Sequence, residues 1–130
     1  MSSRGAYAKN GHITTTEYKK DHMVLDAKVL VGQNRAHSLP DYAHTHSSVY
    51  IKENSDGSFR ELRLYNEESG RLEIEVAFHP EPNINNGNRT TPILHYHLYN
   101  EDLVHGAAHK LESDHPIYER VKKYLEVYGL

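Results

Sequence analysis

The sequence predicts an α+β fold, in which a four- to five-stranded antiparallel sheet carries a C-terminal amphipathic helix packed on one face. Four segments alternate apolar and polar residues with the period of two that is typical of strands. Runs rich in Asn, Asp, Ser and Gly separate the first three of these segments and supply turn chemistry. Near the C-terminus, apolar residues recur at the spacing of a helix. One helix segregated to one face of an antiparallel sheet is the layered arrangement that these elements favour.

The first three predicted strands follow one another through short turns. Residues 47–53 are followed by the run Asn-Ser-Asp-Gly, which returns the chain as residues 58–65. The run Asn-Glu-Glu-Ser-Gly then leads into residues 71–79. Strands joined by such short turns pair antiparallel, so we expect a meander.

Two further segments and the start of the chain complete the predicted organisation. Residues 80–92 contain three prolines and are expected to form a long surface loop before a fourth strand at 93–99. Residues 23–31 are rich in apolar side chains, and their pattern fits either a further strand or a short buried segment. Residues 1–20 show no sustained period and are predicted to be a flexible leader, so that residues 21–130 form a single α+β domain.

The C-terminal helix is predicted from apolar residues three or four positions apart, namely Ile117, Val121, Leu125 and Tyr128. Ser113 or Asp114 can cap its start, and Pro116 suits its first turn. Gly129 suits its end. The apolar stripe predicts which side of the helix packs on the sheet.

The composition limits the kinds of site that the chain can build. There is no cysteine among the 130 residues, which excludes disulfides and thiolate metal sites, but there are 11 histidines. The formal net charge of −3 provides no global positive field, so direct nucleic-acid binding is not expected. No stretch approaches the roughly 20 apolar residues of a membrane span, and the protein is predicted to be cytoplasmic.

Alternation of side chains predicts a polar face on the sheet. On residues 58–65, 71–79 and 93–99 the core side is expected to hold the aliphatic and aromatic residues Leu62, Leu64, Leu72, Ile74, Val76, Phe78, Leu94, Tyr96 and Leu98. The opposite face is then expected to carry polar and aromatic residues: Glu61, Arg63, Tyr65, Glu73, Glu75, His79, His95, His97 and Tyr99. If the first strand begins slightly early, His44 and His46 join this face. Both His-x-His pairs would then share one surface.

These two His-x-His pairs predict a metal site, for which zinc is the expected ion. Histidines two apart on a strand point the same way, so two pairs on neighbouring strands can supply four imidazoles. The predicted ligands are His44, His46, His95 and His97, and the reserve ligands are His79, Glu75, His105 and His109. Three histidines with a water would instead make a catalytic zinc, with Glu75 or Glu73 as base. In a third interpretation, the pairs are merely polar residues suited to a half-buried sheet.

Arg63 leaves two alternatives open. Together with the histidines it can stabilise an anionic transition state, and His with Arg and Tyr is the equipment of metal-independent ribonucleases. It can equally form a surface ion pair with Glu61 or Glu75. In the nuclease alternative, the catalytic residues would be His95, Arg63, His44 and Glu75.

Several short motifs resemble a group of phage proteins: His37-Ser38-Leu39-Pro40, His44-Thr45-His46, Gly57-Ser58-Phe59-Arg60, Leu62-Arg63-Leu64-Tyr65-Asn66 and Leu94-His95-Tyr96-His97. They look like small proteins, and C-terminal extensions, that are encoded beside head genes in phages and prophages of Gram-positive bacteria. The resemblance covers roughly residues 35 to 125. It carries genomic context more than chemistry.

This resemblance implies two functional classes. Phages of these hosts encode small inhibitors of bacterial defence, including anti-CRISPR proteins that act on type II effector nucleases, and some are compact metal-bearing domains. The favoured hypothesis is a zinc-binding inhibitor in the host cytoplasm that blocks DNA loading by such an effector through protein–protein contact. The negative net charge of the chain is complementary to the positive charge expected of a nucleic-acid-binding enzyme. The alternative is a phage-associated nuclease or ribonuclease toxin domain.

Overall fold

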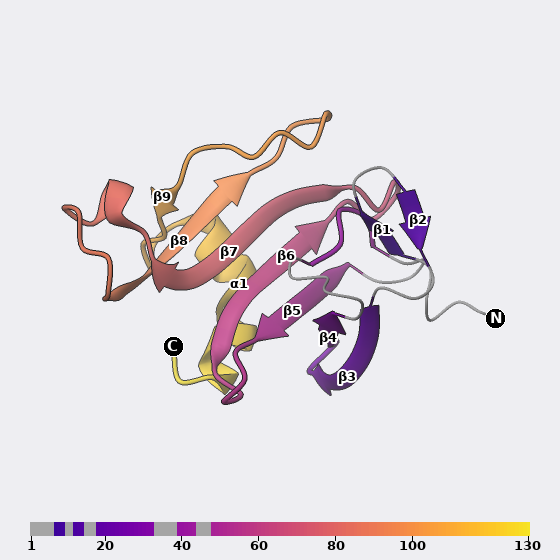
Figure 1. The fold of residues 1–130 in the computed structure, drawn as a ribbon, viewed down its shortest axis with the longest axis horizontal. Helices are drawn as coiled ribbons and strands as arrows, with labels where there is room; N and C mark the ends of the chain where they lie inside the picture. The colour runs from indigo at the N-terminus through magenta and orange to yellow at the C-terminus, as the bar shows by residue number, and fades with distance from the viewer. Residues whose placement is uncertain (1–6, 10–11, 15–17, 33–38, 44–47) are drawn as a thin grey trace.

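The computed structural model describes residues 7–9, 12–14, 18–32, 39–43 and 48–130. It is an α+β fold, as predicted, but its main sheet has seven strands rather than four or five, in the order β3-β4-β5-β6-β7-β8-β9. β1 and β2 form a separate two-stranded sheet. The elements are β1 (Tyr7–Lys9), β2 (His12–Thr14), β3 (Tyr18–Val24), β4 (Ala27–Gly32), β5 (Val49–Glu53), β6 (Phe59–Tyr65), β7 (Leu72–Pro80), η2 (Pro82–Ile84), β8 (Pro92–Leu98), β9 (His109–Lys110) and α1 (Pro116–Val127) (Figure 1).

The predicted antiparallel meander is confirmed in strands β5, β6 and β7, and the separately predicted fourth strand, β8, pairs antiparallel with β7. Leu62 of β6 pairs with Val76 of β7, which in turn pairs with Tyr96 of β8. Turn residues behave as expected, because Gly57 and Gly70 both adopt positive φ, of 87° and 76°. The connection between β7 and β8 contains the short 3₁₀ helix η2.

The N-terminal part of the sheet differs from the prediction. The segment at 23–31 is not one element: it spans the end of β3, a turn at Leu25 and Asp26, and most of β4. Leu25 takes a left-handed φ of 55°, an unusual conformation for a non-glycine residue. Because leucine is not a typical turn residue, the local sequence did not predict this turn. β4 then pairs parallel with β5, which makes the sheet mostly, but not wholly, antiparallel. The predicted leader at 1–20 includes β1, β2 and the start of β3.

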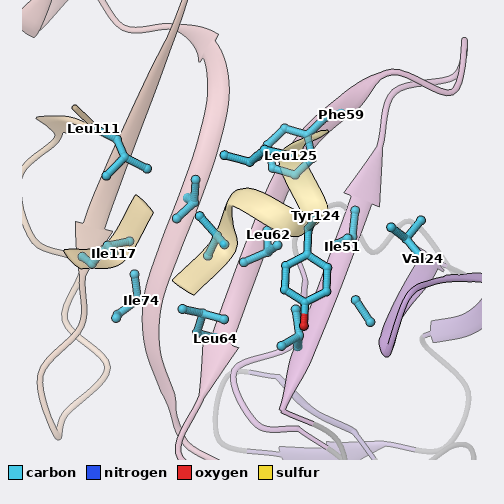
Figure 2. Close-up of a cluster of buried hydrophobic side chains, with 14 of the residues drawn as sticks. Val24, Ile51, Phe59, Leu62, Leu64, Ile74, Leu111, Ile117, Tyr124 and Leu125 are labelled. Carbon is cyan, nitrogen blue, oxygen red and sulfur yellow. The ribbon is translucent and has the colours of Figure 1, made fainter. Parts of the chain in front are cut away.

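Helix α1 lies along one face of the sheet, where it closes the main apolar core (Figure 1). Figure 2 shows side chains from the strands and from α1 filling the space between them, with Leu62, Leu125 and Phe59 among the most deeply buried. Tyr124 donates its hydroxyl hydrogen to Asp26, so the helix is also tied to the β3–β4 turn.

The predicted N-cap of α1 is wrong by one or two residues. His115, rather than Ser113 or Asp114, caps the helix, because its Nδ1 accepts a hydrogen bond of 3.0 Å from the backbone N–H of Ile117. An imidazole nitrogen with a lone pair can do the work of a Ser or Asp oxygen at this position. Pro116 occupies the first turn as predicted.

A second, smaller apolar cluster lies on the other face of the sheet, made of Leu30, Leu39, Tyr50, Tyr65 and Leu72. Leu72 was predicted on the helix side, and that prediction is wrong. A bulge shifts the register so that Leu64 pairs with Ile74 whereas Tyr65 pairs with Leu72, which reverses the alternation at the start of β7. Residues 39–43 cover this end of the sheet, and Tyr65 donates its hydroxyl hydrogen to the carbonyl of Pro40. No helix in the described part of the chain is long and apolar enough to cross a membrane.

Candidate metal centre

The face of the sheet opposite α1 carries polar side chains that are buried. Arg63, Glu75, His95 and His97 are all less than a tenth exposed, and His95 is completely buried. Register explains their grouping, since Arg63 pairs with Glu75 and Glu75 pairs with His97 on three successive strands. Buried polar groups need partners to offset the loss of water. The partners of each group therefore indicate what this face can do.

Three imidazoles on this face are held by the same kind of hydrogen bond. Nδ1 of His95 lies 2.7 Å from the carbonyl oxygen of Ile93, and Nδ1 of His97 lies 2.9 Å from that of Gly106. His79 makes the equivalent contact of 2.9 Å with Pro80. A carbonyl oxygen can only accept, so Nδ1 carries the hydrogen in each ring and Nε2 keeps its lone pair. Such second-atom hydrogen bonds are what fix the tautomer and orientation of metal-binding histidines.

The Nε2 atom of His95 has no hydrogen-bond partner among the described residues, although it is fully buried. The carboxylate of Glu81 lies beside it, with Oε2 4.0 Å away. Burial lowers the pKa of His95, which keeps the ring neutral at physiological pH. Among the described residues no donor lies between these two acceptors, and a metal cation bound to both would satisfy them.

Within the part of the chain that the structure describes, two groups of three residues bring their ligand atoms within 4.8 Å of one another: Glu81 with His95 and His97, and Glu75 with His97 and His105. A tetrahedral zinc with bonds of about 2.0–2.2 Å needs its ligand atoms roughly 3.3 Å apart, so either group requires only modest closure. The groups share His97, whose single available Nε2 can serve only one of them.

Glu75 already forms an ion pair with Arg63, which favours the group containing Glu81 as the metal site. Its Oε2 accepts from both Nε and Nη2 of Arg63, each at 2.9 Å. Burial on its own would raise the pKa of Glu75, but Arg63 and a hydrogen bond with Glu61 outweigh that effect and lower it. Removing Glu75 from this pair to ligate a metal would leave the buried Arg63 with only the more distant carboxylate of Asp41, 3.7 Å from Nη1, as a counter-ion.

Arg63 forms the ion pair that was one of its two predicted roles, but the pair is buried rather than on the surface. Nη1 donates to the carbonyl of Leu39 at 2.7 Å, and Nη2 contacts the hydroxyl of Tyr99 at 3.3 Å. With Glu75 as well, all three guanidinium nitrogens have partners inside the protein. Arg63 thus anchors residues 39–41 to the sheet and is poorly placed to receive a substrate anion.

Glu61 extends this network and holds a proton. Burial, the neighbouring charge of Glu75 and a hydrogen bond between the two carboxyl groups together raise the pKa of Glu61 to about 8. At neutral pH the two carboxyl groups share one proton and the guanidinium balances the remaining charge.

An open hollow of about 380 Å³ lies over this network. It is lined by Lys52, Arg60, Glu61, Arg63, Glu75, His79, Tyr99 and His105. Its two histidines pack against the candidate ligands: the ring centroid of His79 lies 4.7 Å from that of His95, and the centroid of His105 lies 3.9 Å from that of His97. The candidate metal group therefore borders a cavity that is open to solvent.

Gly106 sets the position of one candidate ligand. Its carbonyl oxygen receives the hydrogen of His97 Nδ1, while its N–H donates to the carbonyl of Leu98 at 2.8 Å. A Cβ atom at this position would lie only 2.7 Å from that same Leu98 oxygen. Glycine is therefore needed for the loop after β8 to come close enough to hold the ring.

The predicted ligands fall into three sets. The structure brings His95 and His97 together, and places His79, Glu75 and His105 around them. His109 is not part of this group: it packs on Tyr96, which contacts the core on the α1 side. His44 and His46 lie outside the described residues, so the four-histidine site stays a prediction.

Sequence reasoning missed Glu81 as a candidate ligand. It follows β7 directly, two residues after His79, at the start of the segment that was predicted only as a surface loop. The available signal was an acidic residue at the end of a strand whose neighbour carries a His-x-His pair.

Comparison with known proteins adds nothing to this assignment. No protein-family model matches the chain. The curated proteins and the solved structures likewise contain no match. The phage relationship stays a prediction.

Proposed function

We propose that this protein binds one divalent transition-metal ion, with zinc as the expected species, through Nε2 of His95, Nε2 of His97 and the carboxylate of Glu81. The observation that carries the proposal is the buried lone pair of His95, which faces a carboxylate with no donor between them. The hydrogen bonds from Nδ1 of both histidines to backbone carbonyls support it, because they hold Nε2 in the ligating state.

The chemistry of the donors supports zinc over harder or softer ions. Imidazole nitrogen suits zinc, copper, iron and nickel, whereas magnesium and calcium prefer sites made only of oxygen. Two histidines and one carboxylate form a ligand set that is used by catalytic zinc, in which water fills the remaining position. The proposed set is thus closer to the open site that was considered as an alternative than to the predicted four-histidine site.

This ligand set favours an enzyme over a purely structural metal protein. It supports the hydrolytic class of the nuclease alternative, but with metal ligands in place of the predicted catalytic residues His95, Arg63, His44 and Glu75. The inhibitor of a type II CRISPR effector stays a prediction. Its test is whether the purified protein, at ratios near one to one, suppresses DNA binding by such an effector.

Metal analysis of protein purified without a His-tag tests the proposal. After stripping and reloading with zinc, we expect about one equivalent per chain, bound by the wild type and lost in His95→Ala and in Glu81→Gln, because three ligands cannot be reduced to two without a large loss of affinity. His109→Ala, on the other side of the sheet, is the matched control and should retain the ion. A wild-type protein that holds no stoichiometric metal, or a control that loses as much as His95→Ala, would contradict the proposal.

The double variant His44→Ala/His46→Ala separates this ligand set from the predicted one. We expect it to keep its zinc with an affinity within a few fold of the wild type. A four-histidine site would instead lose two of its four ligands, and the affinity would fall by several orders of magnitude. Competition with a chromogenic chelator measures the difference directly.

A further inference from the structure

We infer that a metal ion reaches the proposed centre through a second, outer position, where His105 is its first ligand. The inference rests on the proposed metal site and adds the route by which that site fills. The outer position is the group of Glu75, His97 and His105, and the inner position is the proposed site of Glu81, His95 and His97. The observation that carries the inference is that the two groups share His97 and differ in their exposure to solvent.

The inner position has little contact with solvent. His95 is completely buried and His97 is 5% exposed, while the side chain of Glu81 is 18% exposed. An ion that arrives with its water shell exchanges those waters for protein ligands in steps, and it must meet the first ligand at the surface. A centre this buried therefore needs an accessible donor on its approach.

His105 is the exposed member of the two groups that converge within the described residues. Its ring lines the open hollow and stacks on His97, with the ring centroids 3.9 Å apart. The ring also packs on Tyr99 at 5.2 Å between centroids, and the backbone of His105 bridges to the same residue. His105 thus holds an imidazole between the solvent and a proposed ligand.

His97 connects the two positions. Its Nδ1 is hydrogen-bonded to the carbonyl of Gly106, so Nε2 is the atom that it offers in either group. A zinc–imidazole bond is about 2.0–2.1 Å long, so the two positions lie no more than roughly 4 Å apart. An ion can pass from one to the other by exchanging its other ligands while it stays bound to His97. No step leaves the ion without a protein ligand.

The outer position is poorly suited to hold the ion at rest. Oε2 of Glu75 already accepts from Nε and Nη2 of Arg63, each at 2.9 Å. A carboxylate has further lone pairs, so Glu75 can contact a passing ion without giving up this pair. The guanidinium charge nonetheless repels an ion held there. The inner position instead offers the unsatisfied Nε2 of His95 beside the carboxylate of Glu81, so it is the more stable of the two.

A position on the route changes the rates of binding and release but not the final affinity. Kd depends only on the free state and the state with the ion in the inner position, whereas the outer position lowers the barrier in both directions. Loss of His105 should therefore slow zinc binding and zinc release by the same factor. A resting ligand behaves differently, since its loss raises Kd and speeds release.

Stopped-flow measurements on the full-length chain test the route, with zinc alone as the probe and a fluorescent chelator that reports free zinc. We expect His105→Ala to slow both binding and release roughly tenfold, with Kd within about twofold of the wild type. His105→Phe keeps a ring that can stack on His97 but has no ligand nitrogen, so it should behave like His105→Ala. His109→Ala is the matched control, because His109 packs on Tyr96 instead, and it should change neither rate.

Zinc content separates failure of this route from failure of the proposed site. A wild type without stoichiometric zinc would refute the proposed function itself. Stoichiometric zinc with unchanged rates in both His105 variants would refute the route and leave the site intact, with entry past the partly exposed Glu81 instead. A raised Kd with faster release in His105→Ala would make His105 a resting ligand, and wild-type rates in His105→Phe would make its role one of packing. Either result would refute its role in entry.

Discussion

The two faces of the sheet differ in how their buried groups are held: α1 covers one face with apolar side chains, whereas the other holds ionic and hydrogen-bonded groups beside its smaller apolar cluster. Under α1, residues such as Leu62 and Val121 are held by close packing and the removal of apolar surface from water. Under the segments at 39–43 and 99–106, Arg63, Glu75 and His97 are held by specific partners.

The difference concerns how each face tolerates change. Apolar burial has no direction, so a core residue that loses one contact keeps the others. A buried charge depends on particular atoms, and loss of one partner leaves the other without water or counter-ion. A protein that needed only a stable sheet would gain little from the second arrangement. Its presence beside unsatisfied His95 is consistent with a face built for a ligand.

The largest expected effect comes from breaking the buried ion pair. Arg63→Met leaves Glu75 buried without its counter-ion, and we expect it to cost about 3–5 kcal/mol of unfolding free energy. Leu62→Ala, on the helix face of the same strand, should cost about 2–5 kcal/mol through lost burial and the cavity left behind. Chemical denaturation of both variants in the presence of a chelator measures the two costs.

A double-mutant cycle sharpens the contrast between the faces. Arg63→Met/Glu75→Leu removes both charges, so its cost should be clearly smaller than the sum of the two single changes. Leu62→Ala/Val121→Ala, in the core, should show no such recovery, since the second deletion only enlarges the cavity. Strict additivity in the first pair would mean that Arg63 and Glu75 are not coupled as the geometry indicates.

The next effect is a dependence of stability on pH that comes from the polar face alone. The pKa of Glu61 is raised to about 8 in the folded protein, from an ordinary value of 4.5. The folded state therefore holds the proton more tightly than the unfolded state. The resulting stabilisation is complete below pH 4.5 and is lost as the pH rises through about 8.

Glu61→Gln tests this dependence because an amide resembles the protonated acid at every pH. In metal-free protein, we expect the variant to match the wild type below about pH 4.5, to exceed its stability by a margin that grows as the pH rises from about 4.5 to about 8, and to keep a lead on the order of a few kcal/mol above that. Glu112→Gln, at an exposed site, is the control and should leave the pH profile unchanged. A wild-type profile that stays flat relative to Glu61→Gln between pH 4.5 and pH 8 would show that the pKa of Glu61 is not raised in the folded protein.

The smallest expected effect lies at the start of α1. His115→Ala removes the cap of the Ile117 N–H and should cost about 1 kcal/mol, whereas His115→Asn should restore most of it. His115 Nε2 also contacts the hydroxyl of Tyr96 at 3.2 Å, so Tyr96→Phe measures that contact separately. Thermal unfolding should rank His115→Ala below His115→Asn, and equal melting temperatures would argue against a capping role.

The sequence predicted the parts of the fold that follow from regular alternation. Val76, Glu75 and His97 lie on the faces expected of them because β6, β7 and β8 pair in register along most of their length. Leu72 did not, because a single bulge reverses the alternation and nothing in the local residue types marks it. The turn at Leu25 and the parallel pairing of β4 with β5 were not predicted for a similar reason. Neither a leucine with positive φ nor the order of strands in a sheet changes the periodicity of the sequence.

The candidate site was predictable only in its composition. The His95 and His97 pair and its face follow from the sequence, but the burial of that face depends on loops whose path does not. Glu81 enters the group because the chain after β7 turns back over β8, and Arg63 leaves it because residues 39–41 supply carbonyl acceptors. Both facts concern tertiary contacts of irregular segments, which local patterns do not encode.

Gly106 has a consequence for which substitutions the chain can accept. It offers no atom to a metal, yet its carbonyl orients His97 and its Cα hydrogen faces an oxygen that would lie 2.7 Å from any Cβ. Even alanine would push the loop away from Leu98 and turn the ring of His97. In a library of variants selected for metal retention, position 106 should therefore be as restricted as a ligand. Such a screen would reveal the geometry of the centre through a residue that never touches the ion.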